Sequence, residues 1–236
     1  MQNTVKLISL LLFLTSCANL HQIESLPKDE YTIQADFVSS AHLRTTDLSR
    51  YKKNKLRKIL VEQTDSLFTF TPLKQDLPAT KINIKEVTNL RLYRHTFDID
   101  ILTIPFKIRP SVSGFPKQLN ANFSAAVYLG RRRGIYQLNT KIKNPKYYPK
   151  LSGVGLGYGA FLGIGGVTMN PFVTQGKITY EYDGLVINSG IAGIYDAKKF
   201  NIGLAAGLDY LADKNRQDWI YHKKLWFGVL LGINLN

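Results

Sequence analysis

Glycine occupies six of the seven odd-numbered positions in the most informative stretch of this chain, residues 153–165. The glycines stand at 153, 155, 157, 159, 163 and 165, so all share one parity. Residues 151–176 carry no charged side chain, which would also suit a transmembrane helix. In a helix, however, these glycines would scatter around the axis, whereas in a β-strand they form one face. The shared parity therefore favours a strand.

The same period of two occurs in two later segments. Every odd position within 225–235 is large and apolar, and the even positions within 200–211 are Phe, Ile, Leu, Ala, Leu and Tyr. The opposite faces are rich in Gly and Ala and carry few charges, so neither face suits bulk water. In a closed barrel within lipid, bulky side chains meet acyl chains and small or polar ones fill a narrow interior. We therefore predict an all-β chain that folds as an antiparallel up-and-down transmembrane β-barrel.

Turn signals divide the predicted barrel, residues 65–236, into eight strands. These strands are expected at 66–73, 81–92, 96–109, 122–132, 153–165, 180–194, 200–211 and 224–235. The interior of an eight-stranded barrel is filled by side chains, which argues against a wide pore. The link at 133–152 is long and basic, so it either extends into the periplasm or hides a miscounted strand.

The final strand also carries a motif that resembles the C-terminal β-signal read by the outer-membrane barrel assembly machinery: Trp226-x-Gly228-x-x-Leu231-x-Ile233. It departs from the usual motif in its first residue, which is normally polar, and in lacking a terminal aromatic residue. Residues 66–236 as a whole resemble the small OmpA-like or OmpX-like class of eight-stranded barrels. The resemblance implies a bacterial outer-membrane protein in contact with lipid and lipopolysaccharide. It also implies the assembly machinery as a partner during biogenesis, and we expect a monomer.

The N-terminus predicts export. Residues 1–18 hold Lys6 and then an apolar run of signal-peptide length, too short to span a bilayer as a helix. The run ends on Leu-Thr-Ser-Cys, which resembles a bacterial lipobox and makes Cys17 the predicted lipidation site. Cleavage after Ala18 is the alternative, in which Cys17 is removed. Because Cys17 is the only cysteine, neither a disulfide framework nor a cysteine metal site is expected.

Residues 19–64 are polar and weakly periodic, and we interpret them as a periplasmic segment with a short helix over 48–62. The chain has a net charge of +14, and its one dense basic run lies at 50–58. No motif of a nucleic-acid-binding fold accompanies this run. A solvated helix or linker is therefore the simpler interpretation, and no nucleic-acid partner is expected.

Three carboxylates fall on the predicted inner faces of the strands, and three arginines are available to neutralise them. An unpaired charge in a low-dielectric interior costs several kcal/mol, so we expect structural ion pairs rather than a catalytic carboxylate pair. The carboxylates are Asp98, Asp100 and Asp209, and the candidate cations are Arg91, Arg109 and Arg132.

These features predict a non-enzymatic outer-membrane protein that contributes to envelope structure or surface contact, with no cofactor and no metal. Two alternatives stay open. A lipid A-modifying barrel enzyme could use His222, although no Ser or Glu adjacent in the sequence supports a catalytic triad. A soluble lipocalin-like barrel, carried as a periplasmic lipoprotein and binding an apolar ligand, would show the same alternation.

Overall fold

Twelve strands and two short 3-10 turns make up the part of the chain that the structure describes. This computed structural model describes residues 21–22, 25–33, 57–73, 79–87, 90–112, 114–143, 146–196 and 200–233. The predicted signal peptide, its Cys17 and most of the basic run 50–58 lie outside these residues. The chain divides into two compact units, unit 1 with residues 1–94 and 135–154, and unit 2 with residues 95–134 and 155–236.

Unit 1 contains an antiparallel sheet that runs β2-β3-β4-β5. Its strands are β2 (Asp29–Ile33), β3 (Arg57–Gln63), β4 (Leu67–Pro72) and β5 (Thr80–Asn83). On the side away from β3, β2 pairs with Leu92 and Tyr93 near the start of β6. Alternate side chains of these strands are buried in one hydrophobic cluster, which includes Tyr31, Ile59, Val61, Phe68, Phe70 and Ile82. Unit 1 therefore has a core of its own.

Strands β2 and β3 lie in the segment 19–64 that the sequence predicted to be polar, with a helix over 48–62. The helix prediction is wrong for residues 57–62, which belong to β3, while residues 48–56 lie outside the described part of the chain. Only two apolar side chains of β3, Ile59 and Val61, are fully buried. That alternation is too short to read as a strand without knowing that β2 and β4 pair on either side of it.

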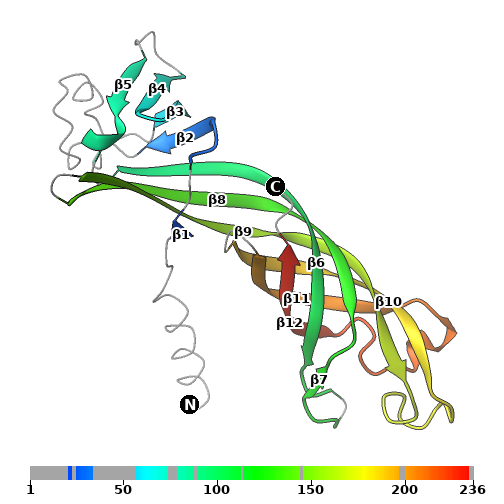
Figure 1. Cartoon of the computed structure of the whole chain (residues 1–236). Coiled ribbons are helices and arrows are strands. Elements are labelled where there is room, and N and C mark those ends of the chain that lie inside the picture. The colour runs from blue at the N-terminus through cyan, green and yellow to red at the C-terminus, as the bar shows by residue number, and fades with distance from the viewer. Residues whose placement is uncertain are drawn as a thin grey trace, which may run out of the picture. The chain divides into compact units, whose positions relative to one another are not determined.

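Three long strands have residues in both units: β6 (Leu90–Arg109), β8 (Ser124–Lys143) and β9 (Lys146–Met169). Figure 1 shows β8 between β6 and β9, and β8 pairs with both. The short β1 (His21–Gln22) pairs with β9. Residues 133–143 and 146–152 belong to β8 and β9, so most of the predicted link is strand, and its extension into the periplasm stays a prediction. Backbone pairing extends the hairpin although lysines interrupt the apolar period.

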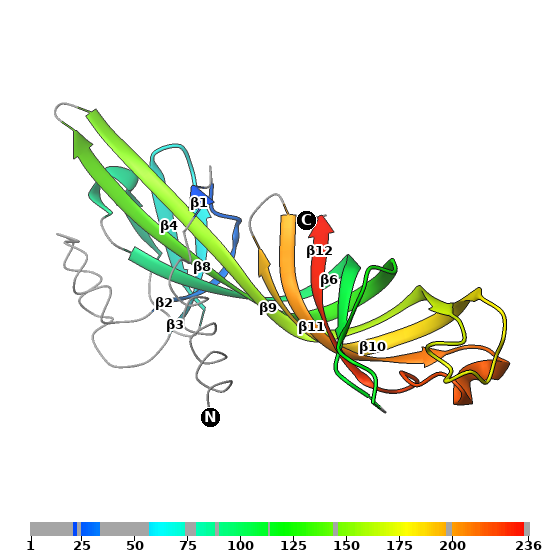
Figure 2. The same ribbon diagram turned by 90° about the horizontal axis from the view of Figure 1, so that it is seen from below.

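In unit 2, each long strand pairs with the next one along the chain, and the last pairs with the first. The order is β6-β8-β9-β10-β11-β12 and back to β6, where β10 is Tyr182–Asp196, β11 is Phe200–Leu211 and β12 is Leu225–Ile233. Figure 2 shows β12 returning beside β6. The short β7 (Gln118–Asn120) also pairs with β6. Each of the six long strands thus has a hydrogen-bonded neighbour on both sides.

The prediction of an all-β, antiparallel chain is confirmed. The cyclic set holds six strands rather than the eight that the turn signals suggested. The first predicted strand, 66–73, is β4 of unit 1, and the second, 81–92, is shared by β5, a 3-10 turn at Ile84–Glu86 and the start of β6. Among the described residues, no helix is long and apolar enough to cross a membrane.

A β-bulge in β6 changes which parity of residues is buried. Opposite β12, the register shifts where Thr103 and Phe106 face Leu231 and Val229, and Pro105 lies in the extra length. Proline has no N–H to give to a ladder and is tolerated in strands at such irregularities. Even-numbered residues are buried before the bulge and odd-numbered ones after it, so Lys107 and Arg109 join the buried face.

Candidate functional site

The exposed face of unit 2 is apolar on all six strands of the cyclic set. Every exposed large hydrophobic side chain among the described residues lies in unit 2, except Leu73. On β9 the exposed apolar stretch runs over nine residues, 156–164, which matches the roughly 9–11 residues that a tilted strand needs to cross a bilayer. The surface, called here the apolar belt, includes Phe97, Ile99, Ile101, Val127, Leu129, Leu156, Leu162, Ile164, Leu185, Ile191, Ile202, Leu204, Phe227 and Leu231.

Glycines occupy the opposite, buried face of β9, as the sequence predicted. A Cβ at Gly159 would lie 2.5 Å from the Cα of Gly130 and would also meet the carbonyl oxygen of Leu129, both on β8. Such distances are far below van der Waals contact, so only glycine lets the two backbones curve this closely. The glycine face is therefore a requirement of tight curvature, not a ligand loop.

An acidic cluster lies at the end of the buried face that is nearer to residues 134 and 155. Arg132 of β8 forms ion pairs with Asp98 of β6 (Nη2–Oδ2, 2.6 Å), Asp100 of β6 (Nη2–Oδ2, 3.2 Å) and Asp196 of β10 (Nη1–Oδ2, 3.1 Å). The Nδ2 of Asn201 on β11 donates to Asp100 Oδ2 at 2.9 Å. One guanidinium thus joins carboxylates from two strands, and a third strand supplies an amide.

A second charged cluster lies at the other end of the same face. Asp209 of β11 is fully buried and forms ion pairs with Lys107 (Nζ–Oδ1, 3.0 Å) and with Arg109, both on β6. The two cations also lie against aromatic rings, with Lys107 Nζ 4.7 Å from the ring centroid of Trp226 and the Arg109 guanidinium 5.0 Å from that of Trp219. Cation–π contacts of this kind stabilise a desolvated cation. Each charged group of this cluster therefore has an oppositely charged group beside it, which indicates a structural role.

Between the two charged clusters, the buried face is filled by apolar side chains. Trp226, Tyr128, Phe161 and Leu230 are almost fully buried and form one hydrophobic cluster with residues of β6, β10 and β11. The ring centroids of Phe161 and Trp226 are 5.8 Å apart. Large side chains that pack against one another in this way leave the buried face with the character of a core.

The structure brings together most of the predicted charged residues, with different partners from those that sequence reasoning could assign. Asp98 and Asp100 share Arg132, and Asp209 pairs with Arg109. Arg91 belongs to unit 1, whereas both clusters belong to unit 2. Two members were missed, Lys107 and Asp196. The parity of the strand before Pro105 places Lys107 outside, and Asp196 lies between the strands predicted at 180–194 and 200–211.

His222 lies in the segment between β11 and β12, and its contacts with the described residues do not form a catalytic triad. Its Nδ1 accepts a hydrogen bond from the backbone N–H of Leu211 at 3.3 Å, and its ring lies 4.9 Å from that of Tyr210. Burial, with Lys223 and Arg216 nearby, lowers the pKa of His222 below its usual value. Within the described ranges, no carboxylate or serine hydroxyl is hydrogen-bonded to this imidazole.

Metal chemistry has no candidate centre in the described part of the chain, because no group of three or more His, Cys, Asp or Glu side chains there is placed to hold an ion. A scan against protein-family models, a search of curated proteins and a search of solved structures return no match to this chain.

Proposed function

We propose that unit 2 is a closed six-stranded β-barrel that spans the bacterial outer membrane, and that the protein serves envelope structure or surface contact rather than catalysis. The observation that carries this proposal is the apolar belt on all six strands of the cyclic set. Monomeric soluble proteins rarely expose contiguous apolar patches larger than a few hundred Å². Hydrocarbon is the solvent in which such a surface is stable.

The cyclic pairing supports the same proposal. A lipid environment offers no hydrogen-bond partners, so a spanning sheet must leave no open edge. In unit 2 each long strand has two paired neighbours, which satisfies this condition. The predicted export signal at residues 1–18 and the motif in the last strand fit delivery by the barrel assembly machinery, with unit 1 remaining in the periplasm.

The buried face favours a structural role over transport, catalysis or ligand storage. Its middle is packed with large apolar side chains, which argues against a wide pore and against the ligand cavity of a lipocalin-like barrel. Its carboxylates are engaged by Arg132, Lys107 and Arg109. Lipid and lipopolysaccharide are then the expected partners of the outer surface.

Membrane extraction of the full chain tests the proposal. We expect the protein to stay with the outer-membrane fraction after a high-salt wash, to require detergent for extraction, and to migrate differently on gels before and after heating. A mature chain that remains monodisperse in detergent-free buffer would overturn the proposal, because the apolar belt would then face water.

An arginine substitution within the apolar belt tests the solvent of that surface directly. Leu162 on β9 is 61% exposed. In a bilayer, Leu162→Arg should cost about 2–4 kcal/mol near the midplane, whereas on a water-facing surface it should be close to neutral. Leu73 in unit 1 is 42% exposed and provides the matched control, Leu73→Arg. Equal stability of the two variants in vesicles, measured by denaturant titration, would contradict a membrane location for β9.

A further inference from the structure

The segment between β11 and β12, residues 212–224, carries several exposed cations. Its four exposed basic residues are Lys214, Arg216, Lys223 and Lys224. Among the described residues, no Asp or Glu forms an ion pair with any of the four. We call these four residues the basic rim.

The acidic residues of the same segment are engaged elsewhere. The Asp213 carboxylate accepts hydrogen bonds from Tyr182 Oη at 2.8 Å and from the backbone N–H of Asn215 at 2.7 Å. Asp218 forms an ion pair with Lys177, with 3.0 Å between Nζ and Oδ1. Neither carboxylate forms an ion pair with the basic rim among the described residues, so the rim keeps a net positive charge that a ligand from outside the chain can meet.

The basic rim begins where the apolar belt ends. Tyr210 follows Leu208 by two residues on β11, so both side chains lie on the same face of the strand. Leu208 is exposed and pairs with the exposed Leu225 of β12. Arg216 Nη1 donates a hydrogen bond to the Tyr210 hydroxyl at 2.7 Å, and Lys223 Nζ lies 5.5 Å from the centre of the Tyr210 ring. Along this edge, apolar side chains give way to an aromatic ring and then to cations. Aromatic side chains are enriched at the boundary of a bilayer, where acyl chains give way to headgroups.

Backbone strain at Lys223 provides an independent observation. Its φ of 55° lies in the left-handed region, which favours glycine and is uncommon for lysine. Its N–H donates to the carbonyl oxygen of Asp209 at 2.8 Å, which fixes this conformation. Gln175 has the same φ, so the conformation alone assigns no role, and it is the contact of Lys223 with the Tyr210 ring that makes this lysine a candidate functional residue.

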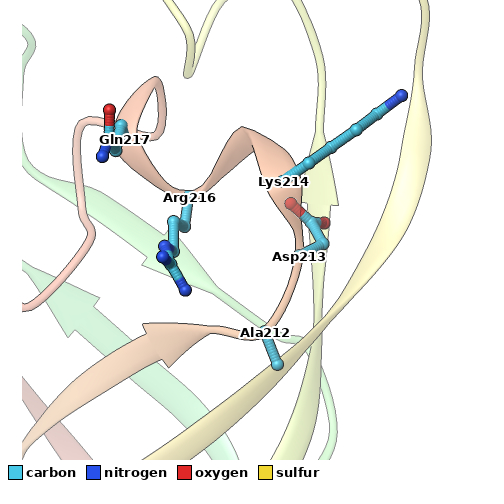
Figure 3. A pocket seen from close by; sticks show the side chains of 5 residues that line it. All are labelled: Ala212, Asp213, Lys214, Arg216 and Gln217. Atoms are coloured by element: carbon cyan, nitrogen blue, oxygen red, sulfur yellow. The ribbon is translucent and has the colours of Figure 1, made fainter.

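The shape of the segment suits a layer of ligands better than one enclosed ligand. A hollow of about 490 Å³ is lined by Ala212, Asp213, Lys214, Arg216 and Gln217. Figure 3 shows the Lys214 and Arg216 side chains extending away from each other, on opposite sides of the turn. Such cations can contact neighbouring headgroups across a membrane surface, and they do not converge on a single anion.

We propose that the basic rim binds the phosphate groups of anionic lipid headgroups in the leaflet at this end of unit 2. The inference rests on the proposed membrane location of unit 2. Phosphate is the recognised chemistry, because Lys and Arg side chains near a membrane surface are attracted to anionic headgroups. Tyr210 holds Arg216 and Lys223 at the boundary between apolar belt and headgroups.

Lipid retention by the full chain tests this binding. The chain, in a nonionic detergent, is incubated with equal amounts of phosphatidylglycerol and phosphatidylcholine and repurified, and the retained lipids are counted by mass spectrometry. We expect phosphatidylglycerol to exceed phosphatidylcholine by about fivefold or more. The double variant Arg216→Ala with Lys223→Gly should bring the ratio near one. Glycine at position 223 also relieves the strained φ. The double variant should therefore be at least as stable as the single variant Arg216→Ala.

The matched control is the double variant Lys58→Ala with Lys81→Ala, which removes the same charge from exposed positions of unit 1. It should keep the preference for phosphatidylglycerol. Equal loss in both double variants would overturn the proposal, because net charge alone would then explain the retention. Displacement of the retained lipid by millimolar inorganic phosphate at matched ionic strength would also overturn it, since the rim would then be a site for free anions.

Insertion into neutral phosphatidylcholine vesicles separates this inference from the proposed function. A chain that inserts but shows no lipid preference refutes only the headgroup site. A chain that does not insert and stays monodisperse without detergent refutes the membrane location, and the headgroup site with it.

Discussion

Replacing Gly159 by alanine should destabilise unit 2 through a clash of backbones. The added Cβ would lie 2.5 Å from the Cα of Gly130 and 2.9 Å from the carbonyl carbon of Leu129, both backbone atoms of β8. No side-chain rotation can relieve this contact, so β8 and β9 must separate. Overpacking of a tight interior costs about 1–3 kcal/mol, and we expect Gly159→Ala to fall in the upper part of this range.

Gly193 on β10 provides the matched control. A Cβ at Gly193 would meet nothing within 4 Å, and its position faces outward. Gly193→Ala should therefore be neutral or stabilise the fold by about 0.4–1 kcal/mol, because alanine reduces the conformational freedom of the unfolded chain. The two alanine variants should thus differ by about 2–4 kcal/mol.

Urea titration of both variants in detergent micelles or vesicles measures this difference, with gel mobility before and after heating as the folding signal. Coincident midpoints for Gly159→Ala and Gly193→Ala would refute the argument that close curvature requires glycine. A second glycine tests the same argument with a side chain as the clashing partner. A Cβ at Gly165 would collide with the side chain of Ser124, so Gly165→Ala should also be destabilising. Adding Ser124→Gly should restore part of its lost stability, and no recovery would show that the contact is not the cause.

Asp209→Asn should leave two buried cations beside each other and cost about 3–5 kcal/mol, seen as a lower urea midpoint; an unchanged midpoint would mean that Arg109 finds water or another partner. The pKa of His222 is lower in the folded chain than in the unfolded chain, so the unfolded chain binds a proton first as the pH falls. The free energy of unfolding should therefore decrease below about pH 6.5, and His222→Gln should weaken this pH dependence. Tyr31→Phe removes the hydroxyl that donates to the Pro27 carbonyl at 2.8 Å and should destabilise unit 1 by about 1 kcal/mol in denaturant titrations; a gain in stability would contradict a useful hydrogen bond.

The alternation of side chains was readable from the sequence because it is a local property of a strand. The parity of the glycines at 153–165 and of the apolar residues at 200–211 predicted both the strands and their faces, and β9 and β11 carry those faces. The same reasoning failed where the period is short or interrupted. Strand β3 holds two fully buried apolar residues, and lysines interrupt the end of β8, so neither segment shows a period of two over enough residues.

The choice of charged partners belongs to the tertiary structure. The inward parity of Asp98, Asp100 and Asp209 on the predicted strands indicated that they need cations, since buried carboxylates are costly alone. Which cation each one meets depends on how strands far apart in the sequence align, as when Arg132 of β8 joins Asp196 of β10. The bulge at Pro105 turns Lys107 toward the buried face, against the parity of the residues before it.

The sequence by itself determined that this chain forms strands with one bulky and one glycine-rich face, because side-chain direction along a strand follows from the backbone of each residue. Only the tertiary structure decided that six strands pair in a cycle, that β2 to β5 form a separate sheet, and which charges neutralise one another. Those features depend on register and curvature, which arise from hydrogen bonds and packing between strands far apart in the sequence, as for Asn201 and Asp100, 101 residues apart.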